Sequence, residues 1–320
     1  MNIWGLAHYG ELTFSWRLTA LFHELELQGH HCKIASMLPT PHVWEDITLP
    51  QVLICRGIVD RPAYDVAVQY KEHGIRIIYD LDDNLWSCFD PPDKIHKADI
   101  VRFNESQQKT YMDFLDLADV ITATMPVYKD LFKNKDKVYN KTWSDKLHIL
   151  PSYMPSWVYK DFNEEEHFKK SYKSYFEYKK YLIIVNSSFE AKYNIPNNIE
   201  LYDPYLKSGN TIVIGKEPEV FKVRGYKYEY VPRIKPLTDY WSYIKDLEVS
   251  ALLRFIDSEV DINKYKSNIK QIEAGMIGCS LYTGTKDKVM HLGAYENSGL
   301  FIDSNMKDHI LEYKEVLQVL

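Results

Sequence analysis

Two lysines, a helix-capping serine and a carboxylate are closely spaced in the last third of the sequence. Lys266 precedes Ser267, a good N-cap residue, and Lys270 follows one turn into the predicted helix. Free N–H groups and the positive end of the helix dipole favour a phosphate at such a helix start. Glu273, one turn further on, could accept hydrogen bonds from the two hydroxyls of a ribose. The alternative is a surface helix with an ordinary cap and a Lys270–Glu273 ion pair.

A second group of charged residues follows a predicted strand in the first half. The segment Tyr79–Trp86 reads YDLDDNLW and carries Asp80, Asp82 and Asp83. Carboxylates this close repel one another unless they are solvated, paired or used in binding. They could orient substrate hydroxyls, and one of them could accept a proton. Two alternatives stay open: Asp82 or Asp83 caps the next turn, or the acids bind a metal.

A third group follows the first predicted strand. His8, Tyr9 and Gly10 come directly after that strand, and Arg17 lies near the start of the next predicted helix. Arg17 could face a phosphate and His8 could act as a base. A surface arginine and a structural histidine are the alternatives.

The elements that would position these residues alternate between strand and helix. Short apolar runs predict strands, and a 3.6-residue apolar period ended by glycine predicts helices. In the first half we expect strands at 2–7, 31–36, 51–55, 75–80, 120–123 and 147–150, and helices at 15–28, 65–73 and 104–118. In the second half we expect strands at 182–186, 211–215, 228–231, 249–255 and 278–282, and helices at 237–245, 267–274 and 304–320.

This alternation predicts an α/β protein with two Rossmann-like domains that face a cleft, each built on a mainly parallel sheet. A length of 320 residues suits two domains. We place the first at 1–155 and the second at 156–303, followed by the helix 304–320. Residues 159–181, dense in Lys, Glu, Tyr and Phe, read as a helical connector or an insertion. Ligands bind beyond the carboxyl ends of parallel strands, so the charged groups belong in the cleft.

The composition and the net charge argue against several classes of function. A net charge of −6 argues against a protein that only coats nucleic acid. Cys32, Cys55 and Cys279 lie in strand-like runs and are expected to be buried thiols. The longest apolar runs are too short for a membrane span, and the start lacks the features of a signal peptide, so we expect a cytoplasmic protein.

Three of these segments resemble one enzyme family. Residues Asn263–Gly275 fill the pattern N-x-x-K-S-N-x-K-x-x-E-x-G, and Tyr79–Trp86 fill Y-D-x-D-D-x-L-W. Together with the segment around Arg17, they resemble GT-B-fold glycosyltransferases of the retaining family-4 type, especially short bacterial and phage-encoded members. The resemblance covers most of the chain and is weakest from 159 to 233.

The resemblance implies roles for individual residues. Lys266 and Lys270 would neutralise the diphosphate of a nucleotide-sugar donor, Ser267 and Asn268 would contact it, and Glu273 would hold the ribose. Arg233 is a candidate for a donor-binding arginine, Asp82, Asp83 and His8 for catalysis, and Tyr9, Gly10, Arg17 and Asp80 for acceptor or phosphate contacts. The sequence departs from the pattern where Tyr265 replaces a glutamate and where Arg254-Phe255 replace Pro-Leu.

The implied reaction moves a sugar to a hydroxyl acceptor with retention, without a permanently bound cofactor and without an obligatory metal. The acceptor is left open between a hydroxymethylated base of phage DNA and a bacterial glycan. Residues 159–181 interleave cations with aromatics, as base-stacking surfaces do, or form a solvated amphipathic helix. A catalytically inactive GT-B-like module that binds a nucleotide or a partner is the alternative, since fold does not fix function. The oligomeric state is not predicted.

Overall fold

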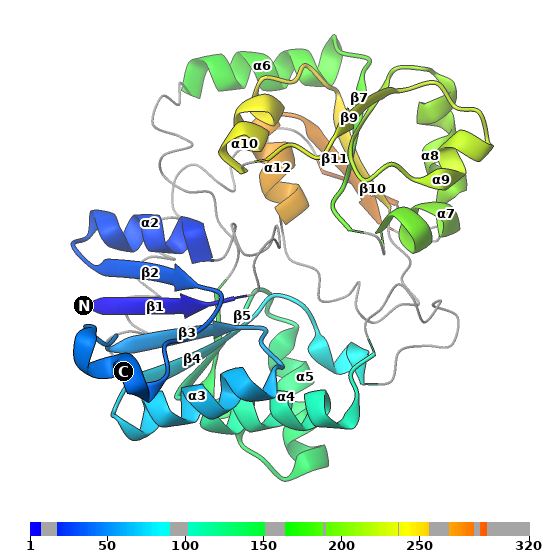
Figure 1. The fold of residues 1–320 in the computed structure, drawn as a ribbon. Coiled ribbons are helices and arrows are strands. Elements are labelled where there is room, and N and C mark those ends of the chain that lie inside the picture. Colours follow the sequence, from blue (N-terminus) through cyan, green and yellow to red (C-terminus); the bar gives the residue numbers. More distant parts are fainter. Residues whose placement is uncertain are drawn as a thin grey trace.

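The computed structural model describes residues 1–7, 18–89, 102–150, 164–187, 190–235, 237–255, 269–284 and 289–292. These residues form two six-stranded sheets, each flanked by helices and drawn one above the other in Figure 1. Two successive α/β halves were predicted, and this fold class is confirmed. The predicted boundary near residue 155 and the predicted helix 304–320 lie outside the described residues.

The first sheet has the strand order β2-β1-β3-β4-β5-β6, with every neighbouring pair parallel. Its strands are β1 (Asn2–Leu6), β2 (His31–Ala35), β3 (Val52–Arg56), β4 (Arg76–Leu81), β5 (Val120–Ala123) and β6 (Leu147–Ile149). The order reverses between β1 and β3, the kind of point at which open α/β sheets bind ligands. All six strands match predicted runs within about two residues, the usual uncertainty of element ends.

The helices of the first half are α2 (Ala20–Leu27), α3 (Arg61–Glu72), α4 (Glu105–Leu117) and α5 (Tyr128–Tyr139), with 3-10 turns η2 (Pro41–Asp46), η3 (Leu85–Cys88) and η4 (Trp143–Lys146). Helix α3 begins four residues before its predicted start. The Asp60 carboxylate accepts from the Ala63 N–H at 3.2 Å, and Pro62 lies in the first turn. Both residues are typical helix-start signals, which the apolar period alone overlooks.

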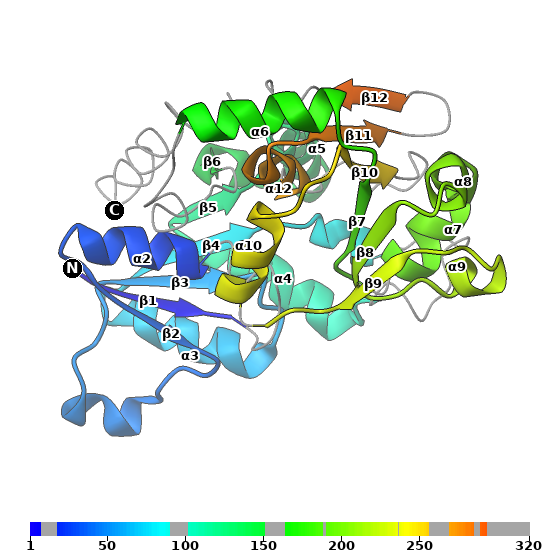
Figure 2. The ribbon, with the colours of Figure 1, turned by 90° about the horizontal axis from the view of Figure 1, so that it is seen from above.

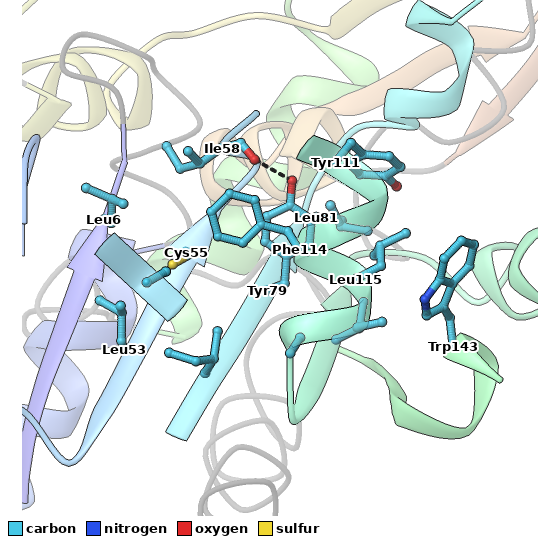
Figure 3. Packing of buried hydrophobic residues seen from close by; sticks show 14 of the residues in the cluster. Leu6, Leu53, Cys55, Ile58, Tyr79, Leu81, Tyr111, Phe114, Leu115 and Trp143 are labelled. Carbon is cyan, nitrogen blue, oxygen red and sulfur yellow. Dashed lines mark hydrogen bonds between the residues drawn. The ribbon is translucent and has the colours of Figure 1, made fainter. Parts of the chain in front are cut away.

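An aromatic core fixes the segment that carries the three aspartates. Tyr79 stacks on Phe114 with ring centroids 5.0 Å apart, and its hydroxyl donates to the Ile58 carbonyl at 2.7 Å (Figure 3). Trp86 packs edge-on against Tyr111 and Phe132. Because rings at both ends of the segment are buried, the acids between them are held at the carboxyl end of β4.

The second sheet has the order β12-β11-β10-β7-β8-β9. Its strands are β7 (Tyr181–Val185), β8 (Thr211–Gly215), β9 (Glu229–Pro232), β10 (Ala251–Phe255), β11 (Ser280–Gly284) and β12 (Val289–Leu292). Strand β12, which the sequence did not predict, runs antiparallel to β11, and the other pairs are parallel. Counted within this half, the order is that of a Rossmann sheet, with its switch point between β7 and β10.

The helices of the second half are α6 (Glu164–Phe176), α7 (Ile195–Asn197), α8 (Ile199–Lys207), α9 (Glu219–Val223), α10 (Leu237–Lys245) and α12 (Ile269–Ile277), with a π-helical turn η6 (Glu190–Asn194). Figures 1 and 2 show α10 and α12 on one side of β7, and α7, α8 and α9 on the other. Buried side chains gather in two separate clusters on these two faces.

Helix α6 accounts for part of the predicted connector at 159–181, and it belongs to the second half. The Ser174 hydroxyl donates to the Val249 carbonyl at 2.6 Å, and the Lys170 ammonium donates to the Lys245 carbonyl. Val249 precedes β10, so this end of α6 lies at the amino edge of the second sheet. In Figure 1, α6 lies on the side of that sheet away from the first one.

The cysteines fit the predicted pattern in part. Cys55 and Cys279 are buried, and burial raises the pKa of each thiol to about 12. Cys32, expected to be buried, is only partly so, because it lies on the edge strand β2. Among the helices that the structure describes, none combines the length and apolar character needed to cross a membrane.

Candidate functional site

Lys270 and Glu273 form an ion pair on α12, with 2.9 Å between the lysine Nζ and the glutamate Oε2. The two side chains are only 6% and 1% exposed. The surface helix considered from the sequence is therefore wrong, although the pair itself forms. Removing both charges from water costs free energy that only close pairing and further hydrogen bonds offset.

Tyr240, on α10, completes the enclosure of Glu273. Its hydroxyl donates to Glu273 Oε1 at 2.6 Å, so each carboxylate oxygen faces a donor or a cation. Burial, and then the negative charge of Glu273, raise the pKa of Tyr240 well above its usual value. The tyrosine therefore remains a neutral donor.

The ammonium of Lys270 retains unused donor capacity. An ammonium has three N–H donors. Among the described residues, its ion-pair contact is Glu273 Oε2, and that contact lacks hydrogen-bond alignment. A buried cation with so few acceptors can bind a further anionic oxygen at little desolvation cost, because it is already out of water.

Polar groups also gather beyond the carboxyl end of β7. The Asn186 N–H donates to Glu190 Oε2 at 3.0 Å, and the Glu190 N–H donates to the Ser187 hydroxyl at 3.1 Å. Burial raises the pKa values of Tyr240 and Tyr202, which come from opposite faces of the sheet, and the charge of Glu190 adds a smaller increase to both. Glu190 thus lies near the switch point. Sequence reasoning missed it, although Ser187-x-x-Glu190 is a capping-box signal.

Arg254 lies one residue before the end of β10, on the other side of the switch point. Side chains alternate along the strand, and Leu252 belongs to the cluster under α10 and α12, so Arg254 shares the face of those helices. The side chain is half-buried, and its Nε is enclosed without a hydrogen-bond partner.

Arg233 does not lie on any of the strands or helices that carry Lys270, Glu273 and Arg254. It is exposed, in the segment between β9 and α10, and β9 is the edge strand of the sheet. No ion pair of Arg233 is found within the described part of the chain. Lys266, Ser267 and Asn268 lie outside the described residues.

In the first sheet, the three aspartates have different surroundings. Asp82 forms a buried ion pair with Arg56, the last residue of β3. Asp80 is buried and accepts from the Thr122 hydroxyl at 2.6 Å. Asp83 is partly exposed. Sequence reasoning missed Arg56, for which the signal was a cation that ends an otherwise apolar strand.

The two alternatives for these acids were a cap of the next turn and a metal site. Asn84 holds the N-cap position of η3, so neither Asp82 nor Asp83 caps that turn as one reading expected. Over the residues that the structure describes, no three His, Cys, Asp or Glu side chains converge on a common metal position. His8, Tyr9, Gly10 and Arg17 lie outside the described residues.

Comparisons with known proteins show the fold. No protein-family model matches the chain, and a search of curated proteins finds no match. Among solved structures, an alpha-glucosyltransferase in complex with UDP-glucose and DNA containing an abasic site is 11% identical, with a TM-score of 0.54 over 98% of this chain and 89% of that one.

Two further structures are similar in the same way. HepE of Anabaena in complex with UDP-glucose is 10% identical, with a TM-score of 0.51 over 88% of this chain and 80% of that one. WaaG, a glycosyltransferase involved in lipopolysaccharide biosynthesis, is 12% identical, with a TM-score of 0.50 over 97% of this chain and 90% of that one. The chain therefore has the two-domain, Rossmann-like GT-B fold.

Proposed function

We propose that the protein is a glycosyltransferase that moves a sugar from a nucleotide-diphosphate sugar to a hydroxyl acceptor. The observation that carries the proposal is the enclosed Lys270–Glu273 pair under Tyr240, in the layer of α10 and α12 next to the switch point of the second sheet. That switch point is where a Rossmann sheet binds a nucleotide. The GT-B fold and its UDP-glucose-bound neighbours support the same reading.

On the donor side, Lys270 would meet the diphosphate, and Glu273 would accept from the ribose through Oε2, which accepts no hydrogen bond from the described residues. Lys266, Ser267 and Asn268 belong to the same sequence pattern and would contact the phosphates. Negative charge grows on the nucleotide diphosphate as the bond to the sugar breaks through an oxocarbenium-like state. Donors and cations that are already held in place stabilise this charge without reorganising, which lowers the barrier.

On the acceptor side, we assign contact with the reacting hydroxyl to Asp83. Asp83 is partly exposed at the end of β4, whereas Asp80 and Asp82 beside it are buried, so an acceptor can reach Asp83 more readily. The acceptor is DNA or a glycan, and retention follows from the sequence resemblance. A DNA-bound neighbour favours DNA. The end of α6 at Ser174 lies at the amino edge of the second sheet, opposite the carboxyl end at which the donor would bind, which does not favour this end of α6 as the acceptor site.

The experiment that tests this function is ligand-induced stabilisation followed by turnover. Uridine, adenosine, guanosine and thymidine diphosphate sugars are screened by thermal shift, and the binding donor is then assayed for nucleotide release with hydroxymethylated DNA or glycan acceptors. At 100 times its dissociation constant, a true donor adds roughly 2.7 kcal/mol to the stability. Lys270→Met should lower turnover roughly 100-fold, while Arg76→Met, at an exposed strand start, should not.

Two outcomes would count against the proposal. Absence of stabilisation by every nucleotide-sugar would exclude the donor site. Binding without nucleotide release under any acceptor would favour the alternative, a GT-B-like module without catalysis. Thermal unfolding of the free Lys270→Met protein shows whether any loss of turnover is merely a loss of folding.

A further inference from the structure

We propose that Arg254 is a phosphate-binding residue of the donor site, where it adds cationic charge to that of the lysines assigned to the diphosphate. The inference rests on the proposed function, since it concerns the diphosphate of a nucleotide-sugar. Arg254 stands where the resembling enzymes have proline, so the sequence pattern gives it no role. Its position, its charge balance and its unsatisfied donor point to one.

The position of Arg254 follows from the strand it occupies. Strand β10 pairs with β7 on one side and with β11 on the other, so it borders the switch point directly. Arg254 is the penultimate residue of the strand and lies on the face covered by α10 and α12. Lys270 lies in the first turn of α12, the helix that follows β10 in this parallel layer. Both cations are therefore near the carboxyl end of the sheet, on one face.

The charge balance around Lys270 favours a further cation at the diphosphate. Lys270 is paired with Glu273, and the pair carries no net charge. A sugar-nucleotide diphosphate carries more than one negative charge, and burying it against a neutral pair would leave it uncompensated. Arg254 forms no ion pair with any acid among the described residues, so its full positive charge is available.

The side chain itself suits a phosphate. A guanidinium presents N–H donors in a planar fork that matches phosphate oxygens, and it stays charged when it is partly buried. The Nε–H of Arg254 is enclosed without an acceptor. A buried donor without an acceptor costs free energy, which a bound phosphate oxygen would recover. The residue as a whole is only partly buried, so a ligand can reach it.

The test compares a nucleotide with its nucleoside, so that phosphate contacts are separated from the rest of the site. UDP and uridine are titrated by calorimetry into the wild-type protein, Arg254→Met, Arg254→Lys and the control Arg76→Met. A charged hydrogen bond is worth enough to weaken UDP binding roughly 10- to 100-fold in Arg254→Met. Uridine binding should not change, Arg254→Lys should lie between, and Arg76→Met should match the wild type.

The remaining outcomes of these titrations distinguish a failure of the Arg254 inference from a failure of the proposed function. If wild-type protein binds UDP and Arg254→Met binds it equally well, Arg254 has no phosphate role, although the proposed function stands. Equal losses for UDP and uridine would make Arg254 a structural residue and overturn the inference. If the wild type binds neither UDP nor the adenosine, guanosine and thymidine diphosphates, the proposed function fails first. Arg254→Lys keeps the test decisive should Arg254→Met not fold.

Discussion

Two opposite charges, Lys270 and Glu273, are buried together, and each would be costly without the other. Glu273→Gln leaves the Lys270 ammonium buried without a counter-charge, and we expect this to lower the free energy of unfolding by about 3–5 kcal/mol. Replacing both residues, Lys270→Met with Glu273→Leu, should cost much less than the sum of the single changes. Urea denaturation of the four proteins measures the coupling.

Glu72→Gln is the matched control for this cycle. Glu72 is the exposed last residue of α3, and the same chemical change there should stay within about 0.5 kcal/mol. Additive single and double effects would mean that the two charges do not depend on each other in the folded protein. If the double variant is stable but binds no donor, the pair is needed for binding and not for folding.

The sequence located these charged residues but not their neighbours. Local patterns are sufficient to mark Lys270 and Glu273, because both lie within two turns of one helix. Tyr240 is 33 residues from Glu273, and Arg56 is 26 residues from Asp82, and both contacts form only when separate elements pack. No local period encodes such contacts. For the same reason, the burial of the pair was not foreseen.

At the scale of elements, the close approach of β7 and β8 depends on one glycine. Gly215 ends β8 with φ +99°, and a Cβ there would lie 2.3 Å from the Val185 carbonyl oxygen. Gly209 also has a positive φ, +73°, but open space around it. Gly209→Ala should cost about 1 kcal/mol for its backbone conformation. Gly215→Ala should cost roughly 1–3 kcal/mol more, because the neighbouring strand must also shift.

Urea denaturation of the two alanine variants measures this difference. Equal losses would show that the strand ends separate at no cost, contrary to the tight packing inferred for β7 and β8. If Gly215→Ala also weakens nucleotide binding while Gly209→Ala does not, the spacing of these strand ends matters for the site as well as for stability.

The elements that the sequence predicted best are those with strong apolar patterns. Strands β5 and β8 and helix α10 have the predicted bounds. Helix α5 was missed because only Tyr128 and Phe132 of its residues are buried, so its apolar period is weak. Helix α8 carries Pro204 inside, which reads locally as a helix breaker. Strand β12 is short, and its pairing with β11 is a tertiary contact.

For the molecule as a whole, buried tyrosines predict a loss of stability at high pH. Burial raises the pKa values of Tyr79, Tyr111 and Tyr240 well above normal. Their contribution to the free energy of unfolding is complete below the pKa of an unfolded tyrosine, about 10. It falls as the pH rises above that value, because the unfolded chain then releases these protons while the folded protein keeps them. Urea midpoints measured from about pH 8 to about pH 11 should decrease above about pH 10.

Tyr79→Phe should make this decrease shallower, whereas Tyr172→Phe, at a site 55% exposed, should leave it unchanged. A flat profile up to about pH 11 would contradict the conclusion that these buried tyrosines stay neutral in the folded protein. At neutral pH, Tyr79→Phe is expected to cost about 1 kcal/mol for its lost hydrogen bond to the Ile58 carbonyl.

The edge strands β2 and β9 affect whether molecules associate with one another in concentrated solution. An edge strand offers unpaired backbone groups to any other chain with a free strand. Strand β9 is only four residues long and ends in Pro232, which has no N–H to donate. Strand β2 exposes His31 and Lys33. Brevity, proline and charge at these two edges oppose sheet extension from one molecule to the next, and hence aggregation.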